Sequence, residues 1–263
     1  MCVGLDETDQ TMSAKELASA RSFWKRKNLR DGRRSRYVEV EEVSLDSLRA
    51  DAVENGLVDE VVSILATGKE ADVYVGLWKE VPLALKVYRL HRTPHKKKAM
   101  IGYSVDRMGL IAAKEFTVLE KAYRAGVPVP TPARRVDNMF TMRFLGDETS
   151  ASRLKELDLE EPERYAKQVL EIIEKLLDAF IVHADLSEYN LLLYRGRIFA
   201  IDFGQSVDLS SRTDRHRRFE DARPLLRRDL ENVARYFSRY DIEIDALAEY
   251  DRLTTKFENT HLD

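Results

Sequence analysis

Residues 181–193, IVHADLSEYNLLL, place a run of polar side chains between two apolar flanks. The polar centre has the spacing H-x-D-x4-N, formed by His183, Asp185 and Asn190, and the stretch IDFG with Asp202 follows at residues 201–204. A turn between two strands could use the Asp and the Asn only to cap backbone groups. Two such motifs in succession favour another interpretation, because carboxylate and amide oxygens are the ligands that Mg²⁺ takes in proteins. The pattern therefore predicts a metal-dependent site on a loop that the flanking strands hold rigid.

The order of these residues matches the protein-kinase pattern. In that pattern the Asp of H-x-D-x4-N accepts the proton of the attacking hydroxyl group, while the Asn and the Asp of D-F-G bind metal ions. Asp185 is then the catalytic acid–base residue, and Asn190 and Asp202 are the metal ligands.

Lys86 and Glu115, which precede these motifs in the chain, also fit the protein-kinase pattern. Lys86 lies in the alternating stretch VPLALKVYRL, where an inward-facing lysine is costly unless it is paired. A lysine that faces water at a sheet edge is the alternative. Glu115 lies on the apolar face of a helix predicted over residues 110–125 and is the expected partner, with Glu120 as its rival. The alternative is that both acids are solvated. The sequence thus predicts an ion pair between a strand lysine and a helix glutamate, as in kinases.

The stretch ATGKEADV, residues 66–73, lies between two predicted strands. It contains one glycine, Gly68, and one lysine, Lys69. By itself the stretch fits an ordinary hairpin turn equally well. Ahead of Lys86, however, its backbone N–H groups and the Lys69 charge predict a loop that binds phosphate oxygens.

The patterns along the chain predict an α+β, two-lobed fold of the protein-kinase type. We expect strands over residues 61–90, a loop over 91–109, the helix over 110–125, and a strand over 138–146 that runs into a connector. A long helix with Pro162 in its first turn, short strands, and terminal helices over 227–240 and 242–257 follow. The expected parts are a polar and basic extension over 1–43, an N-lobe over 44–142 and a C-lobe over 143–263. No A-P-E motif follows IDFG, so the C-lobe is expected to be truncated, without an activation loop and peptide-docking helices.

The amino-acid composition limits the classes of protein to which the chain can belong. The chain has 263 residues, 44% hydrophobic and 34% charged, as in soluble globular proteins, and its net charge of −3 argues against general affinity for nucleic acid. Its single cysteine, Cys2, excludes an internal disulfide and favours a reducing, cytoplasmic setting. No apolar run reaches the roughly 18 residues that span a bilayer, and no signal-peptide pattern occurs, so no membrane association is expected.

Taken together, ATGKEADVY, ALKVYR, KEF, HADLSEYN, IDFGQSV and RRDLENVARYFSRY resemble the RIO family of atypical serine/threonine protein kinases, most closely its Rio1 subgroup. The resemblance covers roughly residues 45–240. It implies ATP and Mg²⁺ as cofactors, with Mn²⁺ as an alternative. The catalytic residues that it implies are Lys86, Asp185 and Asp202, and the metal ligands are Asn190 and Asp202. In this family the metal-binding Asp is also proposed to carry a transient phosphoryl group, which would make Asp202 a covalent nucleophile.

The resemblance also implies the residues that hold the nucleotide. These are Leu65, Thr67, Gly68, Lys69, Val73, Lys86, Glu115, Met142, Arg143 and Leu145. Met142 would face the adenine pocket, and the backbone of Arg143 and Leu145 would hydrogen-bond the adenine edge. The chain departs from the family loop at Ala66, where the family usually has a serine, so one hydroxyl group near the γ-phosphate is missing.

For the function, the resemblance implies an autophosphorylating kinase with ATPase activity that assists maturation of the small ribosomal subunit, as a cytoplasmic monomer with pre-ribosomal RNA and proteins as partners. The basic stretches 21–36 and 212–228 are the expected RNA contacts, and solvated charge runs are the alternative. Ser104 is either a self-phosphorylation site or a solvated loop serine. Two other functions are consistent with the motifs. One is a small-molecule kinase of the aminoglycoside or choline type, although such enzymes carry a sizeable substrate-binding insert. The other is a non-catalytic, nucleotide-sensing assembly factor.

Overall fold

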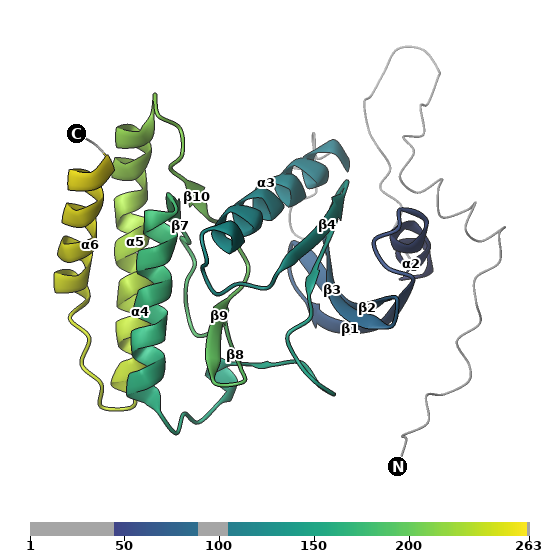
Figure 1. Ribbon diagram of the computed structural model, residues 1–263, viewed down its shortest axis with the longest axis horizontal. Helices are drawn as coiled ribbons and strands as arrows, with labels where there is room; N and C mark the ends of the chain where they lie inside the picture. Colours follow the sequence, from purple (N-terminus) through teal and green to yellow (C-terminus); the bar gives the residue numbers. More distant parts are fainter. Residues whose placement is uncertain (1–44, 89–104, 262–263) are drawn as a thin grey trace, which may run out of the picture.

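The computed structural model describes residues 45–88 and 105–261. The extension predicted over residues 1–43, with its basic stretch 21–36, and the loop serine Ser104 lie outside the described residues. The described elements form two groups, a sheet with two helices and a bundle of three helices, with short strands between them (Figure 1).

The first group is built on a five-stranded antiparallel sheet. Its strands are β1 (Glu60–Thr67), β2 (Ala71–Trp78), β3 (Val81–Tyr88), β4 (Pro132–Val136) and β5 (Met139–Arg143), in the order β1-β2-β3-β5-β4. Successive side chains of β3 point to opposite faces. Leu85 and Val87 join the apolar core with α2 (Leu45–Glu54), while Lys86 and Tyr88 face Glu115 of α3 (Val105–Arg124). Because β3 is a central strand, the edge-lysine alternative is wrong.

The helix that supplies Glu115 is longer than predicted. It begins at Val105 rather than at residue 110, and it includes Gly109. The sequence prediction assigned residues 91–109 to a loop because they show no clean periodicity, and Gly109 gives no helix signal since a glycine inside a helix costs up to about 1 kcal/mol relative to alanine. At the other end, Gly126 has a φ of +75°, the left-handed conformation that commonly ends helices.

The second group contains α4 (Pro162–Asp178), α5 (Arg215–Ser238) and α6 (Ala246–His261). Between this bundle and the large sheet lie short elements (Figure 1). They are β6 (Ser152–Arg153), the 3-10 turn η1 (Leu154–Glu156), β7 (Ile181–Val182), β8 (Leu191–Tyr194), β9 (Arg197–Ala200) and β10 (Val207–Asp208). Asp245 accepts hydrogen bonds from the N–H groups of Leu247 and Ala248, so α6 begins at Ala246 rather than at Ile242 as predicted.

The apolar flanks of HADLSEYN are strands, as predicted, but they do not pair with each other. The flank before the loop is β7, which pairs with β10, and the flank after the loop is β8, which pairs with β6 and β9. The loop is therefore held between two separate small sheets. Because β7 and β8 pair with different strands, the two ends of the loop cannot shift in register against each other, as the two strands of a hairpin could.

The described architecture is α+β and two-lobed, as predicted from the sequence. From Asp202 the chain passes through β10 to α5 at Arg215, so residues 203–214 are too few for a long activation loop. The lobe boundary expected between residues 142 and 143 stays a prediction; β5 ends at Arg143, and residues 144–151 connect it to β6.

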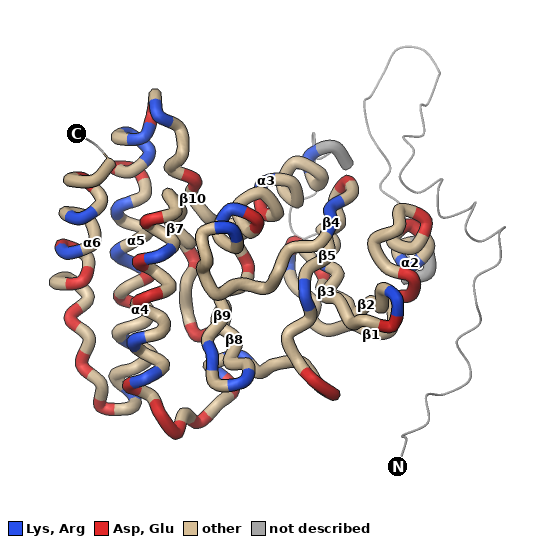
Figure 2. The backbone as a smooth tube through the Cα atoms, viewed as in Figure 1, with Lys and Arg blue, Asp and Glu red and all other residues tan. Residues whose placement is uncertain are grey.

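The charges of the described residues are mixed in sign rather than segregated. Lys and Arg alternate with Asp and Glu along α5 and α6 (Figure 2). Within the basic stretch 212–228, Arg223 pairs with Glu220 and Glu258, and Arg227 pairs with Glu231. Over residues 45–88 and 105–261, no helix combines the length and the apolar character that crossing a bilayer requires.

Candidate active site

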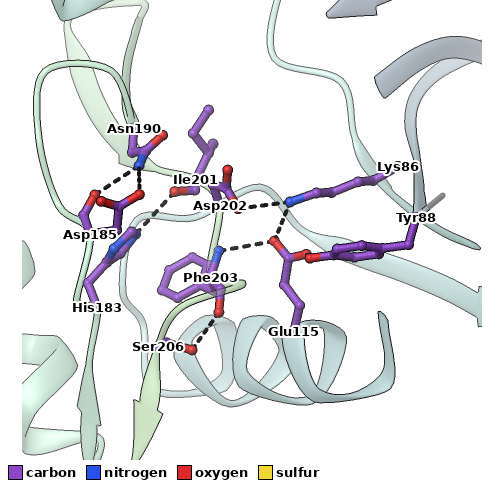
Figure 3. A network of polar contacts seen from close by, with 10 residues as sticks. All are labelled: Lys86, Tyr88, Glu115, His183, Asp185, Asn190, Ile201, Asp202, Phe203 and Ser206. Atoms are coloured by element: carbon purple, nitrogen blue, oxygen red, sulfur yellow. Dashed lines mark hydrogen bonds and ion pairs between the residues drawn. The ribbon is translucent and has the colours of Figure 1, made fainter. Parts of the chain in front are cut away.

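Lys86 is the centre of a cluster of charges that joins three elements. Its Nζ atom lies 2.7 Å from Oε1 of Glu115 on α3 and 2.9 Å from Oδ1 of Asp202, which follows β9. The Lys86 side chain is only 9% exposed. Burial alone would lower the pKa of this lysine, but the two carboxylates outweigh burial and raise it. Lys86 is therefore a fixed cation that ties the sheet, α3 and the Asp202 loop together (Figure 3).

Glu115 has partners for both of its carboxylate oxygens. Oε1 accepts hydrogen bonds from Lys86 and from the backbone N–H of Phe203, the latter at 3.0 Å. Oε2 accepts a hydrogen bond from the hydroxyl of Tyr88. Burial and the neighbouring Glu115 charge raise the pKa of Tyr88, so this hydroxyl keeps its proton and acts as a donor. The rival acid, Glu120, instead pairs with Arg124 at the helix surface.

Asp202 stands at the open side of this cluster. Its side chain is 51% exposed even though Oδ1 contacts Lys86. Burial would raise the pKa of its carboxyl group, but Lys86, His183 and the N–H of Gly204 outweigh burial, and the pKa lies below its usual value. The residue has a φ of +66°, an unusual backbone conformation for a non-glycine residue and one that clusters at functional sites. Asp202 is thus ionised and accessible.

Asp185 and Asn190 face each other across the catalytic loop predicted from HADLSEYN. The Asn190 amide donates to the Asp185 carbonyl at 2.8 Å and to its carboxylate Oδ2 at 3.2 Å (Figure 3). The backbone N–H of Ile201 donates to the carbonyl of Asn190 at 3.0 Å, which ties this loop to the Asp202 segment. The Asn190 amide therefore bonds a backbone carbonyl, as the capping interpretation expects, but Asp185 and Asn190 also line the same cavity as Lys86 and Asp202.

His183 makes a second link between the two loops. Its Nε2 lies 3.1 Å from the carbonyl oxygen of Ile201, and its ring packs 4.8 Å from that of Phe203. Burial lowers the pKa of this histidine, so the imidazole is neutral and donates its Nε2 proton to the carbonyl. The first residue of the H-x-D motif is therefore a structural support.

Asp229 of α5 supports the loop from below. Its side chain is 1% exposed, and its two oxygens accept hydrogen bonds from the N–H groups of Ala184 and Leu186 at 2.7 and 2.9 Å. Ala184 has a φ of +65°, a conformation that costs an alanine about 1–3 kcal/mol and persists only where the surrounding structure imposes it. Asp229 supplies that constraint, together with Arg228, which donates to the Ala184 carbonyl.

A cleft between the two groups of elements brings the predicted nucleotide-binding residues together. It consists of a cavity of about 420 Å³ next to Lys86 and an adjoining one of about 280 Å³ next to β5. The larger cavity is lined by the predicted residues Thr67, Gly68, Lys69, Val73, Lys86, Glu115, Met142, Asp185, Asn190 and Asp202. The smaller one is lined by Leu65, Val73, Met142, Arg143 and Leu145. Every residue predicted for the site lies on this cleft.

The larger cavity is lined by the charged side chains of Lys69, Lys86, Asp185 and Asp202, whereas most of the residues that line the smaller one have apolar side chains. The turn between β1 and β2 forms one wall of the larger cavity, where a Cβ atom on Gly68 would lie 2.7 Å from the Ala71 carbonyl oxygen. The turn therefore needs glycine at this position. The stretch ATGKEADV is both a hairpin turn and a wall of the cleft, so its two interpretations are compatible.

Comparisons with known proteins agree with this geometry. Residues 72–250 match the model of the RIO domain. The chain is 34% identical over 215 residues to the RIO-type serine/threonine-protein kinase Rio1 of Haloferax volcanii, covering 77% of this chain and 71% of that protein. It is also 30% identical over 225 residues to the serine/threonine-protein kinase RIO1 of Homo sapiens, covering 78% of this chain and 38% of that protein. This chain belongs to the RIO family.

The fold agrees with this membership. The crystal structure of the Rio2 kinase–ADP/Mg²⁺–phosphoaspartate complex from Chaetomium thermophilum is similar, with a TM-score of 0.58 at 20% sequence identity, covering 79% of this chain and 66% of that one. The predicted kinase-like α+β fold, the RIO family and its Rio1 subgroup are therefore confirmed. The relatives named above are serine/threonine protein kinases, which supports that enzyme class over the small-molecule kinase alternative.

The RIO-family site also fits the divalent cation that the family implies. Among the described residues, no group of three or more His, Cys, Asp and Glu side chains could hold a metal ion. Asn190 and Asp202 nevertheless offer an amide oxygen and an ionised carboxylate on one cavity. Mg²⁺ is typically held by one or two protein oxygens and completes its shell with water and phosphate oxygens. The donor set therefore suits Mg²⁺ bound together with a nucleotide.

Several residues that build this RIO site could not be identified from the sequence. Tyr88 and Asp229 were not predicted as site residues, and His183 was predicted as part of the H-x-D-x4-N motif but was given no role. Each acts through a partner that is remote along the chain: Glu115 for Tyr88, the loop at 184–186 for Asp229, and Ile201 for His183. For Asp229, the only local indication in the sequence was an acidic residue in the apolar pattern of RRDLENV, and this pattern does not indicate that the residue bonds to the loop at 184–186.

Proposed function

We propose that this chain binds ATP with Mg²⁺ in the cleft, transfers its γ-phosphoryl group to itself and to a protein serine or threonine, and hydrolyses ATP when no other acceptor is present. The observation that carries the proposal is the contact of Lys86 with both Glu115 and Asp202 in a cavity shared with Asp185 and Asn190. Kinases need this combination of a buried lysine, a helix glutamate and a metal-binding aspartate.

The nucleotide would lie along the cleft with its base in the smaller cavity and its phosphates in the larger one. The base would lie in the smaller cavity beside Met142. There the Arg143 N–H already donates to the Thr131 carbonyl, and the Leu145 carbonyl already accepts from the Ala151 N–H. Contacts to the adenine edge would therefore use the Arg143 carbonyl and the Leu145 N–H. The phosphates would lie in the larger cavity, where Lys86 and the N–H groups of the β1–β2 turn are the donors.

Asp185 and Asp202 would have different roles in the reaction. Asp185 is exposed on the cavity wall, and its carboxylate accepts a hydrogen bond from Asn190, so its remaining lone pairs can accept the proton of an incoming hydroxyl group. Asn190 and Asp202 would hold Mg²⁺, which would neutralise charge on the transferred phosphoryl group.

A second role for Asp202 is that of a covalent nucleophile. A carboxylate oxygen of Asp202 would form a bond to the γ-phosphorus as the bond to the β-phosphate oxygen breaks, which leaves ADP and an acyl phosphate. The similar Rio2 structure is that of a complex with ADP, Mg²⁺ and phosphoaspartate, which supports this path. Water would later release phosphate, and the net reaction would be ATP hydrolysis.

We further propose a cellular role in small ribosomal subunit maturation, as a cytoplasmic monomer that contacts pre-ribosomal RNA and proteins. Membership of the RIO family and of its Rio1 subgroup supports this role. The chain covers 35–41% of the length of several eukaryotic relatives, so functions of their remaining segments are not carried over to it. The basic stretches 21–36 and 212–228 are the proposed RNA contacts.

The test is to incubate the purified chain with ATP and Mg²⁺, to measure phosphate release, and to locate any phosphate by mass spectrometry. A hydroxylamine-sensitive phosphate on Asp202 would support the acyl phosphate, and stable phosphate on Ser104 or another serine would support autophosphorylation. Asp202→Ala should abolish both signals, while Asp221→Ala, an exposed aspartate on α5 outside the cleft, should retain them. Undiminished ATP hydrolysis in Asp202→Ala would refute the proposed site.

A further inference from the structure

Arg153 lies where the two cavities of the cleft meet. Six residues line both cavities: Ala66, Val73, Pro130, Met142, Arg153 and Ile201. Five of these have apolar side chains, so Arg153 is the only hydrogen-bonding side chain among them. None of the kinase motifs includes it, and the family resemblance implied no role for it. Its position raises the question of what an arginine contributes at an otherwise apolar junction.

The strand that carries Arg153 fixes its direction. In β6, Arg153 is opposite Leu192 of β8, which also lines the smaller cavity. Its backbone N–H donates to the Glu156 carboxylate at 3.1 Å, and the next residue, Leu154, is fully buried. The chain on both sides is thus anchored, and Arg153 remains half-buried on the cleft wall. The backbone that carries Arg153 is therefore fixed beside the cleft, which reduces the ordering cost when its side chain contacts a ligand.

The charge of Arg153 is available to a ligand. Within residues 45–88 and 105–261, no carboxylate forms an ion pair with its guanidinium group. Lys86, by contrast, is already bound by Glu115 and Asp202. A nucleotide triphosphate brings about four negative charges, so a second cation on the base side of the phosphate cavity has a clear electrostatic use. Arginine suits phosphate because its planar group can donate two parallel hydrogen bonds.

We infer that Arg153 is a nucleotide-binding residue that contacts the α-phosphate of ATP. This inference rests on the proposed function, because it assumes that the base occupies the smaller cavity and the phosphates the larger one. A residue at the junction then faces the phosphate closest to the ribose. Arg153 binds the nucleotide before and after transfer alike, so it contributes to affinity and not to the chemical step.

The test compares nucleotide affinities of wild type and Arg153→Gln by isothermal titration calorimetry with adenosine, AMP, ADP and ATP. Loss of a charge-assisted contact weakens binding by about tenfold or more. We expect this loss for AMP, ADP and ATP, with unchanged affinity for adenosine and an ATPase KM that rises while kcat stays constant. Arg153→Lys should bind AMP, ADP and ATP more tightly than Arg153→Gln but less tightly than the wild type, because lysine keeps the positive charge but cannot donate two parallel hydrogen bonds.

Two controls separate this inference from the proposed function and from a folding defect. Arg197 is an exposed arginine of β9, in the same small sheet as β6, and does not line the cleft, so Arg197→Gln should bind all four ligands like the wild type. If the wild-type chain fails to bind ATP, the proposed function itself is wrong. If the wild type binds ATP and Arg153→Gln binds it equally well, or loses adenosine to the same extent, only the assignment of Arg153 to the α-phosphate is overturned.

Discussion

The hydroxyl group of Tyr88 provides the most direct test of the buried charge cluster. It donates to Oε2 of Glu115, while Lys86 and the N–H of Phe203 occupy Oε1. Tyr88 is 3% exposed, and its ring lies 5.4 Å from the Lys86 ammonium. Tyr88→Phe would remove the hydroxyl and keep the ring, so the packing of β3 against α3 would stay intact. The change would leave one oxygen of a buried, charged carboxylate without its donor.

The size of the effect follows from the charge of the acceptor. Hydrogen bonds to charged groups contribute roughly 1.5–3 kcal/mol, compared with about 1 kcal/mol for neutral pairs. We therefore expect Tyr88→Phe to lower the free energy of unfolding by about 2 kcal/mol. For a domain of this size, that loss corresponds to a fall in Tm of about 4–8 °C. ATP turnover should fall by less than about tenfold, because Lys86 and Phe203 still hold Glu115 in place.

Urea denaturation followed by circular dichroism gives the stability change, and Tyr236→Phe provides the matched control. Tyr236 is also buried, at 5% exposure, but its hydroxyl donates to a neutral acceptor, the Leu154 carbonyl, at 2.7 Å. We expect this control to lose only about 1 kcal/mol. Equal losses in the two variants, or a Tyr88→Phe protein as stable as the wild type, would show that the Tyr88–Glu115 contact does not stabilise a charge.

Three further predictions concern other parts of the site. Burial raises the pKa of Asp229 to about 7, so the native state holds this proton more tightly than the unfolded chain does, and stability should fall as the pH rises from about 4 to 7. Urea titrations across this range should show a flatter pH dependence for Asp229→Asn than for the wild type, whereas the exposed-site control Asp221→Asn should keep the wild-type slope. Gly68→Ala would place a Cβ atom 2.7 Å from the Ala71 carbonyl oxygen, a backbone atom, so the phosphate loop must shift; calorimetry should show weaker ATP binding, and thermal denaturation should show a lower Tm. Gly109→Ala meets only ordinary contacts of 3.6 Å or more inside α3, so thermal denaturation should show a gain of up to about 1 kcal/mol; a loss would mean that the α3 backbone at this residue differs from the one described.

The site residues that lie close together in the sequence could be predicted from it. His183, Asp185 and Asn190 share one loop, and Asp202 lies just beyond the next two strands, so their spacing identified the catalytic loop and the metal ligands as one unit. The alternation around Lys86 predicted an inward-facing lysine, and the apolar helix face predicted Glu115 as its partner. These inferences succeeded because strand and helix periodicity decide which way a side chain points. Periodicity did not reveal where α3 begins, because Gly109 is tolerated inside a helix that the sheet supports.

Contacts between segments distant in sequence were decided only by the tertiary structure. The sequence by itself determined the α+β kinase-like class, the catalytic loop and the Lys86–Glu115 pair, since each depends on local pattern and spacing. The remaining nucleotide-binding residues along the cleft were implied by the resemblance to the RIO family. The folded chain decided that Tyr88 completes the Glu115 carboxylate, that Asp229 holds the strained loop from α5, and that Arg153 stands between the two cavities. Such contacts depend on how whole elements pack, and a hydrogen bond between residues 45 positions apart leaves no periodic trace in the sequence.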